Sequence, residues 1–145
     1  MGHIVYDQGE QHIVETYFTA TSFTGPFYIG LGVGAFPQAE SSSLADVTEV
    51  NGLGYARQPV QRDASPFGWS VGDPLCPMGT AQAAEITWKN ISTDLCWDPA
   101  DYAFLTTSPL ALDEPNILIA AVDLANTVIL EPQKKLKMIF RFQQV

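Results

Sequence analysis

The feature that most constrains the fold of this chain is a series of short apolar stretches separated by turn residues, which recur about every ten residues. The clearest one closes the chain, where Leu136, Met138, Phe140 and Phe142 alternate with mostly charged residues. Alternation with a period of two is typical of a β-strand that buries one face. No stretch sustains a helical period. The pattern predicts an all-β fold, a β-sandwich resembling a jelly roll, with at most one short helix and with long loops.

A second alternating stretch lies at residues 26–36. Four large apolar residues alternate there with one tyrosine and three glycines. Glycine inside a strand indicates either a bend or the close approach of another backbone. The glycine spacing differs from that of a nucleotide-binding loop, and Pro37 follows where the helix of such a loop would begin.

Further short elements are expected along the rest of the chain. Strands are predicted at residues 55–60, 86–90, 102–107, 117–122 and 127–130. Pro59 marks the first of these as an edge strand or a strand end. Ser43 is the expected N-cap of a short helix that ends by about Val50. The N-terminal segment fits either a strand or a short helix, and residues 63–82 are expected to be irregular.

The length of 145 residues predicts a single β-sandwich domain over residues 1–145, with an N-terminal arm over about residues 1–25. Charged residues make up only 16% of the chain, against about a quarter in a typical soluble domain. So few charges leave much of the outside uncharged. This composition favours a homo-oligomer, a dimer or a trimer, or a surface that is buried on a partner.

The net charge of −9 is unevenly distributed. All sixteen acidic residues lie in residues 1–133, whereas residues 134–145 hold four of the seven basic residues. A mostly acidic surface repels phosphate backbones, so nucleic acid is not an expected partner. The basic end is interpreted as protection of an edge strand against stray pairing, and pairing with acidic surface on a neighbour is the alternative.

Membrane insertion and secretion are not expected either. The longest uninterrupted apolar run, Ile117–Val122, is far too short for a membrane span. The start of the chain lacks a basic region followed by an apolar run. Cys76 and Cys96 do not make a zinc site by themselves, and we expect two buried thiols, with a disulfide as the alternative.

The stretch GWSVG around Ser70 matches G-x-S-x-G, the pattern of a hydrolase nucleophile elbow. Such an elbow needs a strand before the serine and a helix after it, but Pro66 precedes Ser70 and Pro74 follows it. The histidine of the triad follows the serine in that fold, whereas His3 and His12 both precede Ser70. The match is therefore interpreted as chance.

Other groups of reactive side chains are no more specific. His12 and Glu15 supply only two ligands for a metal. Asp94, Asp98 and Asp101 lack the spacing and the central glycine of a calcium-binding loop. No pair of carboxylates stands out for acid–base catalysis. We therefore expect no catalytic residue, no metal, no cofactor and no enzymatic activity.

One stretch does stand out as a motif, the Gly-Tyr-x-Arg unit within GYARQ. Gly54 permits a turn with positive φ. Tyr55 can bury its ring and form hydrogen bonds through its hydroxyl, and Arg57 can fork onto a carboxylate or a carbonyl across the sheet. The unit is expected to fasten a strand to a loop inside the domain, and a contact with a neighbouring subunit is the alternative.

The order of motifs around this unit resembles a group of small structural proteins from the virions of tailed bacteriophages. In chain order the motifs are FYIGL, LADVTEV, GYARQPV, ITWKNIS, the turn at Trp97, YAFLTTS, LIAAVDL and KKLKMIFRF. The likeness runs from about Phe27 to Phe142. Proteins of this group are head decoration (cement) proteins or tail- and fibre-associated proteins, and no residue in the likeness is catalytic.

The resemblance implies a non-enzymatic virion protein, in the first place a capsid cement protein that binds the outer head shell and stabilises it by bridging capsomers. Its partners would be the major capsid protein of the same particle and other copies of itself, and its location the virion, assembled in the host cytoplasm. The alternative is a tail or fibre module that binds a host surface glycan through Trp97. The residues expected to contact partners are Ile4, Tyr6, Phe67, Trp69 and Trp97.

Overall fold

The computed structural model describes residues 2–18, 26–61, 69–71, 80–109 and 117–143 of the chain. The strands in these ranges are β1 (His3–Val5), β2 (Phe27–Gly32), β3 (Gln58–Val60), β4 (Trp69–Val71), β5 (Thr80–Ala83), β6 (Ile86–Lys89), β7 (Ala100–Thr106), β8 (Leu118–Val128), β9 (Lys135–Met138) and β10 (Arg141–Gln143). They are accompanied by the helix α1 (Asp7–Phe18) and a 3-10 turn, Leu44–Asp46.

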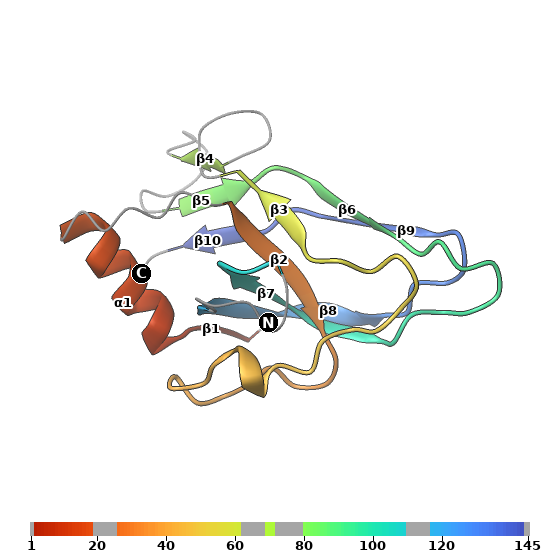
Figure 1. Cartoon of the computed structure of the whole chain (residues 1–145), viewed down its shortest axis with the longest axis horizontal. Coiled ribbons are helices and arrows are strands. Elements are labelled where there is room, and N and C mark those ends of the chain that lie inside the picture. The colour runs from red at the N-terminus through yellow and green to blue at the C-terminus, as the bar shows by residue number, and fades with distance from the viewer. Residues whose placement is uncertain (1, 19–25, 62–68, 72–79, 110–116, 144–145) are drawn as a thin grey trace.

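The strands form two antiparallel layers (Figure 1). The larger layer is a five-stranded sheet in the order β1-β8-β7-β2-β3. The other layer consists of the sheet β10-β5-β4 and the ribbon β6-β9. These two parts are continuous, because the backbone N–H of Ala83 donates to the carbonyl oxygen of Phe140 at 2.8 Å, where both strands pass from one part to the other. The predicted all-β fold is confirmed, whereas this topology does not identify a jelly roll.

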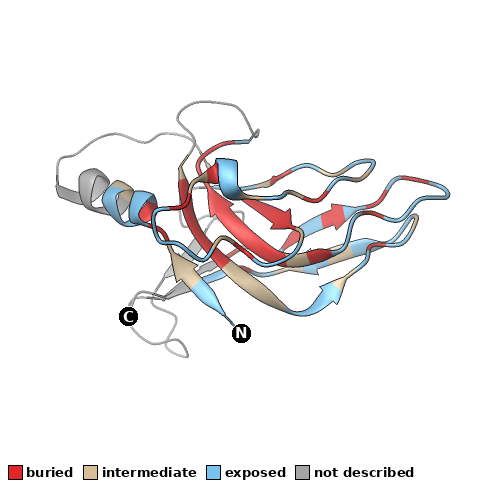
Figure 2. Ribbon diagram, turned by 90° about the horizontal axis from the view of Figure 1, so that it is seen from below, coloured by how far each residue is buried: buried red, intermediate tan, exposed pale blue. Residues whose placement is uncertain are grey.

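Apolar residues are buried on both faces of the five-stranded sheet. The core between the layers includes Ile29, Leu31, Trp88, Leu105, Ile119 and Phe140. A second cluster, on the other face, contains Tyr6, Phe36, Leu44, Tyr102, Phe104, Leu118 and Ala121. Figure 2 shows the buried residues concentrated along the middle of this sheet and the exposed residues in the loops at its end.

The glycines of β2 are explained by aromatic rings on the neighbouring strand. Gly30 lies opposite Phe104 and Gly32 lies opposite Tyr102 in the pairing of β2 with β7. A Cβ atom on either glycine would overlap the ring that lies across from it. The glycines thus make room for aromatic side chains. The sequence had suggested a bend or the close approach of another backbone instead.

The N-terminal segment is both a strand and a helix. β1 pairs with β8 through Ile4 and Ala121, so residues 3–5 of the predicted N-terminal arm belong to the sheet. Asp7 and Glu10 in the first turn of α1 are favourably placed for the helix dipole. Ser43 caps the 3-10 turn as expected, but no longer helix follows, because the backbone beyond it pairs with β2 through the N–H of Val50 and the carbonyl of Leu31.

Three strand predictions need correction. Residues 117–122 and 127–130 were expected as two strands, but β8 runs through them as one. The closing stretch is two strands, since β9 pairs with β6 and β10 pairs with β5. The alternation continues through the break because Phe140 is still buried, so the pattern does not reveal it. Residues 63–82 were expected to be irregular, yet they contain β4 and most of β5.

Candidate functional site

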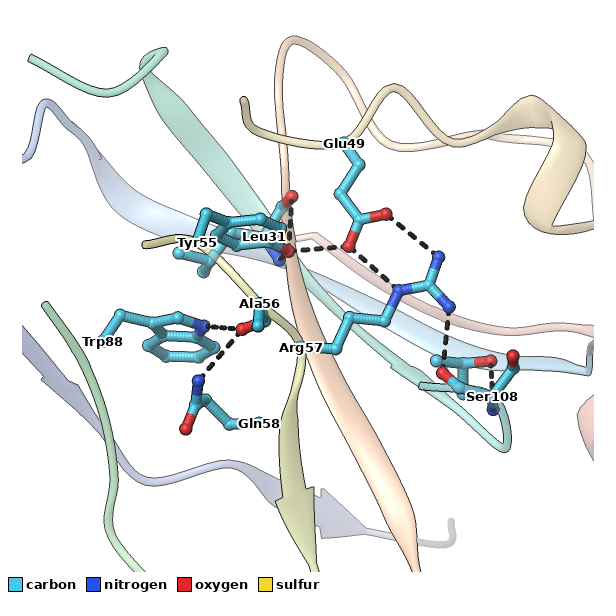
Figure 3. A network of polar contacts seen from close by, with 9 residues as sticks. Leu31, Glu49, Tyr55, Ala56, Arg57, Gln58, Trp88 and Ser108 are labelled. Atoms are coloured by element: carbon cyan, nitrogen blue, oxygen red, sulfur yellow. Dashed lines mark hydrogen bonds and ion pairs between the residues drawn. The ribbon is translucent and has the colours of Figure 1, made fainter. Parts of the chain in front are cut away.

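The Gly-Tyr-x-Arg unit lies at the centre of a polar network that joins residues 49–57 to the larger sheet (Figure 3). Arg57 donates from Nε to Oε1 of Glu49 at 2.9 Å and from Nη2 to Oε2 at 3.0 Å. Its Nη1 donates to the carbonyl oxygen of Ser108 at 2.9 Å. Only 3% of the Arg57 side chain is exposed, against 22% for Glu49. The guanidinium thereby connects the segment before β3 to the segment after β7.

Tyr55 completes the network from the other side of the Glu49 carboxylate (Figure 3). Its hydroxyl donates to Oε1 of Glu49 at 2.8 Å and accepts from the backbone N–H of Leu31 at 2.8 Å. Burial, followed by the charge of Glu49, raises the pKa of Tyr55 far above its ordinary value, so this hydroxyl remains a donor. Gly54 precedes it with a φ of +86°. All these contacts join residues of the same chain, and each polar group named here forms a hydrogen bond with another.

Two tryptophans form hydrogen bonds with the backbone of residues 53–56. Trp88 belongs to the second layer, and Trp97 lies near the end of the molecule opposite α1. Trp88 donates from Nε1 to the carbonyl oxygen of Ala56, and Trp97 donates from Nε1 to that of Leu53, both at 3.0 Å. The ring of Trp97 packs edge-on against that of Tyr55, with 5.5 Å between their centroids. The network therefore fixes the backbone on both sides of the Gly-Tyr-x-Arg unit.

Three loops meet at the end of the molecule opposite α1, and we call residues 51–54, 91–96 and 129–134 the end-loop surface (Figure 1). The backbone N–H of Ile91 donates to the carbonyl of Leu53 at 3.3 Å. The N–H of Trp97 donates to the carbonyl of Leu130 at 3.0 Å. The loops are thus joined to one another through their backbones.

Two amide side chains strengthen these joints. Asn90 is fully buried, and its Nδ2 donates to the carbonyl oxygens of Leu95 and Leu130 at 2.8 Å each. Gln133 has a φ of +63°, and its Nε2 donates to the carbonyl oxygens of Ile91 and Ser92 at 3.0 and 2.8 Å. The end-loop surface is therefore held in shape by hydrogen bonds within the chain.

Large apolar side chains gather on this surface. The large hydrophobic residues that are exposed in the described part of the chain are Leu53, Ile91, Leu95, Ile129 and Ile139. All but Ile139 belong to the end-loop surface, with Leu95 the most exposed at 66%. Sequence reasoning missed this cluster because it joins three loops that are distant in the chain. The only signal was the occurrence of single large apolar residues inside turn-rich stretches.

Two of the five residues that were expected to contact partners are buried inside the chain. Tyr6 is fully buried, with its hydroxyl donating to the carbonyl of Pro37 at 2.9 Å, and Trp97 is only 3% exposed. Their expected role as contact residues is corrected, since each completes a buried cluster of this chain. Ile4 is half-buried on β1. Trp69 begins β4, whose side chains are not described, and Phe67 lies outside the described residues.

The serine of the hydrolase-like pattern is not at an elbow. Ser70 is the middle residue of β4 and pairs with Gln82 of β5. A nucleophile elbow places its serine at the turn after a strand. Within the residues that the structure describes, no three His, Cys, Asp or Glu side chains are grouped as a metal site. The arrangement around Ser70 therefore offers no support for acyl transfer.

The remaining acidic and thiol candidates have local roles. Asp98 accepts from the backbone N–H of Asn51 at 3.0 Å. Asp101 accepts from Thr127 and from the N–H of Gly34, and these hydrogen bonds, that of Thr127 first, lower its pKa. Cys96 is exposed, so the expectation of a buried thiol is wrong for this residue, while Cys76 lies outside the described residues.

Comparison with known proteins adds no relatives to this picture. Neither a protein-family model nor a curated protein matches the chain. No helix in the described ranges has the length and apolar character needed to cross a membrane.

Proposed function

We propose that this chain is a non-enzymatic structural protein of a tailed-phage particle, a decoration subunit that binds the outside of the assembled head shell. The observation that carries the proposal is the end-loop surface. It presents Leu53, Ile91, Leu95 and Ile129 to solvent on loops that are held in place by the amide side chains of Asn90 and Gln133 and by backbone hydrogen bonds. A preformed apolar surface suits binding to other protein subunits, because little conformational entropy is lost when it binds.

The proposed mechanism is mass action. A subunit that binds the assembled shell, and not the dispersed coat protein, shifts the equilibrium toward assembly and stabilises the shell. The low charge content of 16% supports extensive contact between subunits, because protein interfaces are depleted of charge at their centres. The proposed partners are the major capsid protein and further copies of the chain.

A glycan-binding tail or fibre module is less well supported. Its stacking residue, Trp97, is buried, and its indole N–H donates to the carbonyl of Leu53. Sugar stacking requires an aromatic face that is open to solvent.

The test is cosedimentation of the purified full chain with heads that lack it. The proposal expects saturable binding to the heads and a higher temperature of head disruption once the protein is bound. Dispersed coat protein serves as the control, and it should bind weakly. Absence of binding, with head stability unchanged by the protein, would contradict the proposal.

A further inference from the structure

The first loop of the end-loop surface begins with the pair Asn51-Gly52, and the sequence contains no second Asn-Gly pair. The structural use of such a pair is a tight turn with positive φ. The turn that follows covers residues 52–55 and is closed by the N–H of Tyr55, which donates to the carbonyl of Gly52 at 3.0 Å. Its positive φ belongs to Gly54. The turn therefore does not depend on the asparagine.

Asparagine is one of the chemically labile residues of proteins. The groups that meet when it deamidates are its side-chain amide and the backbone nitrogen of the next residue. Asn51 is exposed, and Gly52 has no side chain that would shield its nitrogen. In the part of the chain that the structure describes, neither the Asn51 amide nor the Gly52 N–H forms a hydrogen bond. Both reacting groups are thus unbonded.

We propose that Asn51 is a site of spontaneous deamidation in the folded protein. The nitrogen of Gly52, after it loses its proton to hydroxide, attacks Cγ of Asn51. A C–N bond forms, the Cγ–Nδ2 bond breaks, and ammonia leaves with a proton taken from water. Water then opens the resulting cyclic imide at either of its carbonyls, which leaves aspartate or isoaspartate at position 51. The net reaction consumes water and releases ammonia, without oxidation or reduction.

Either product changes a contact that holds the loop. The N–H of Asn51 donates to Oδ2 of Asp98 at 3.0 Å, and its carbonyl accepts from the N–H of Asp98 at 3.1 Å. Both products add a carboxylate beside that of Asp98, and neighbouring like charges repel. Isoaspartate also lengthens the main chain between the two groups that Asp98 holds. Because a Cβ on Gly52 would already overlap the ring of Trp97, a shift of the loop displaces the indole.

The experiment is peptide mapping by mass spectrometry after the native full chain is incubated in mildly alkaline buffer. The expected result at Asn51 is the mass shift from an amide to an acid, together with isoaspartate that an isoaspartyl methyltransferase labels. The rate should rise with pH, because the attack needs a deprotonated nitrogen. Asn126 is the internal control, since it is also exposed but precedes Thr127, whose branched side chain hinders the attacking nitrogen. It should keep its amide.

Asn51→Gln is the matched variant, because it keeps an amide whose longer side chain closes the imide ring far more slowly. The tryptophan fluorescence of the wild-type chain should shift as isoaspartate accumulates, whereas that of the variant should stay constant. Incubation continues until a sample unfolded in urea has reacted at Asn51. A native chain that is still intact at Asn51 by then, or equal modification of Asn51 and Asn126, would overturn the inference. Neither measurement involves phage heads, so the inference is independent of the proposed function.

Discussion

Arg57 and Glu49 form a two-pronged ion pair, with Nε to Oε1 at 2.9 Å and Nη2 to Oε2 at 3.0 Å. The pair is anchored to β2, because Glu49 forms a β-bridge with Gly32. The guanidinium also lies over the ring of Phe104, 5.3 Å from its centroid. The Arg57 side chain, which is only 3% exposed, thus connects three segments that are distant in the sequence. A charge that is buried to this degree requires such partners.

Replacement of this arginine should therefore be severe. Arg57→Ala removes the two hydrogen bonds that its guanidinium donates to the Glu49 carboxylate and the one that it donates to the Ser108 carbonyl, and we expect a loss of about 3–5 kcal/mol in the free energy of unfolding. Urea denaturation measures it. The matched control is Lys137→Ala, which removes the exposed pair with Glu85 and should cost less than about 1 kcal/mol. Similar losses in both variants would contradict the structural role of Arg57.

The Tyr55 hydroxyl is a second, smaller test of the same network. Tyr55→Phe keeps the ring against Trp97 but removes the donor to Glu49 and the acceptor of the Leu31 N–H. We expect a loss of about 1–3 kcal/mol in the free energy of unfolding. Tryptophan fluorescence should stay nearly unchanged, since the ring packing is retained. Unchanged stability would show that water replaces the hydroxyl at no cost.

Gly52 tests how tightly the end loops are packed. A Cβ at this position would overlap the ring of Trp97, whereas a Cβ at Gly34 would meet no atom within 4 Å. Gly52→Ala should displace the indole, alter tryptophan fluorescence and cost about 1–3 kcal/mol. Gly34→Ala, the control, carries only the strain of its φ of +79° and should cost about 1 kcal/mol without a spectral change. Identical spectra for the two variants would contradict the packing of Trp97.

Alkaline pH should unfold the protein through its buried tyrosines. Burial, as the largest cause, raises the pKa of Tyr102 to about 12 and raises that of Tyr6 as well, from the ordinary 10.0. Below pH 10 the hydroxyls are protonated in both states and stability is complete. Above it the unfolded chain loses protons that the folded chain retains, so stability falls by up to about 1.4 kcal/mol per pH unit for each tyrosine.

Urea midpoints between pH 8 and pH 12, with absorbance at 295 nm to follow tyrosinate, measure this dependence. Tyr102→Phe removes one of the groups and should reduce the slope above pH 10 relative to the wild-type chain. A midpoint that is independent of pH in that window would show that these hydroxyls are accessible to solvent in the folded protein.

The sequence predicted the strands whose side chains alternate over one buried face. β2 follows from the spacing of Ile29 and Leu31, and Pro59 correctly marked β3 as an edge strand. Alternation says which side a residue faces but not which strand lies beside it. For that reason the division between β9 and β10 and the continuity of β8 were not predictable.

The candidate site was less predictable, because its parts depend on tertiary neighbours. The forked contact of Arg57 was foreseen in type, but the identity of Glu49 as its partner depends on the bridge to Gly32. The role of Asn90 could not be predicted, because its partner, the carbonyl of Leu130, is distant in the sequence. Trp97 was expected on the surface as a residue that contacts partners, yet it is only 3% exposed and donates to the carbonyl of Leu53 in the end loops.

The central claim is that this chain is a structural subunit of a phage head. It is tested most directly by the protein composition of purified particles, measured as the molar ratio of this chain to the major capsid protein. We predict a copy number comparable with that of the coat protein. We also predict that the chain no longer binds the coat protein once the heads are dissociated. Absence from the particles, or presence at only the few copies of a tail component, would contradict it.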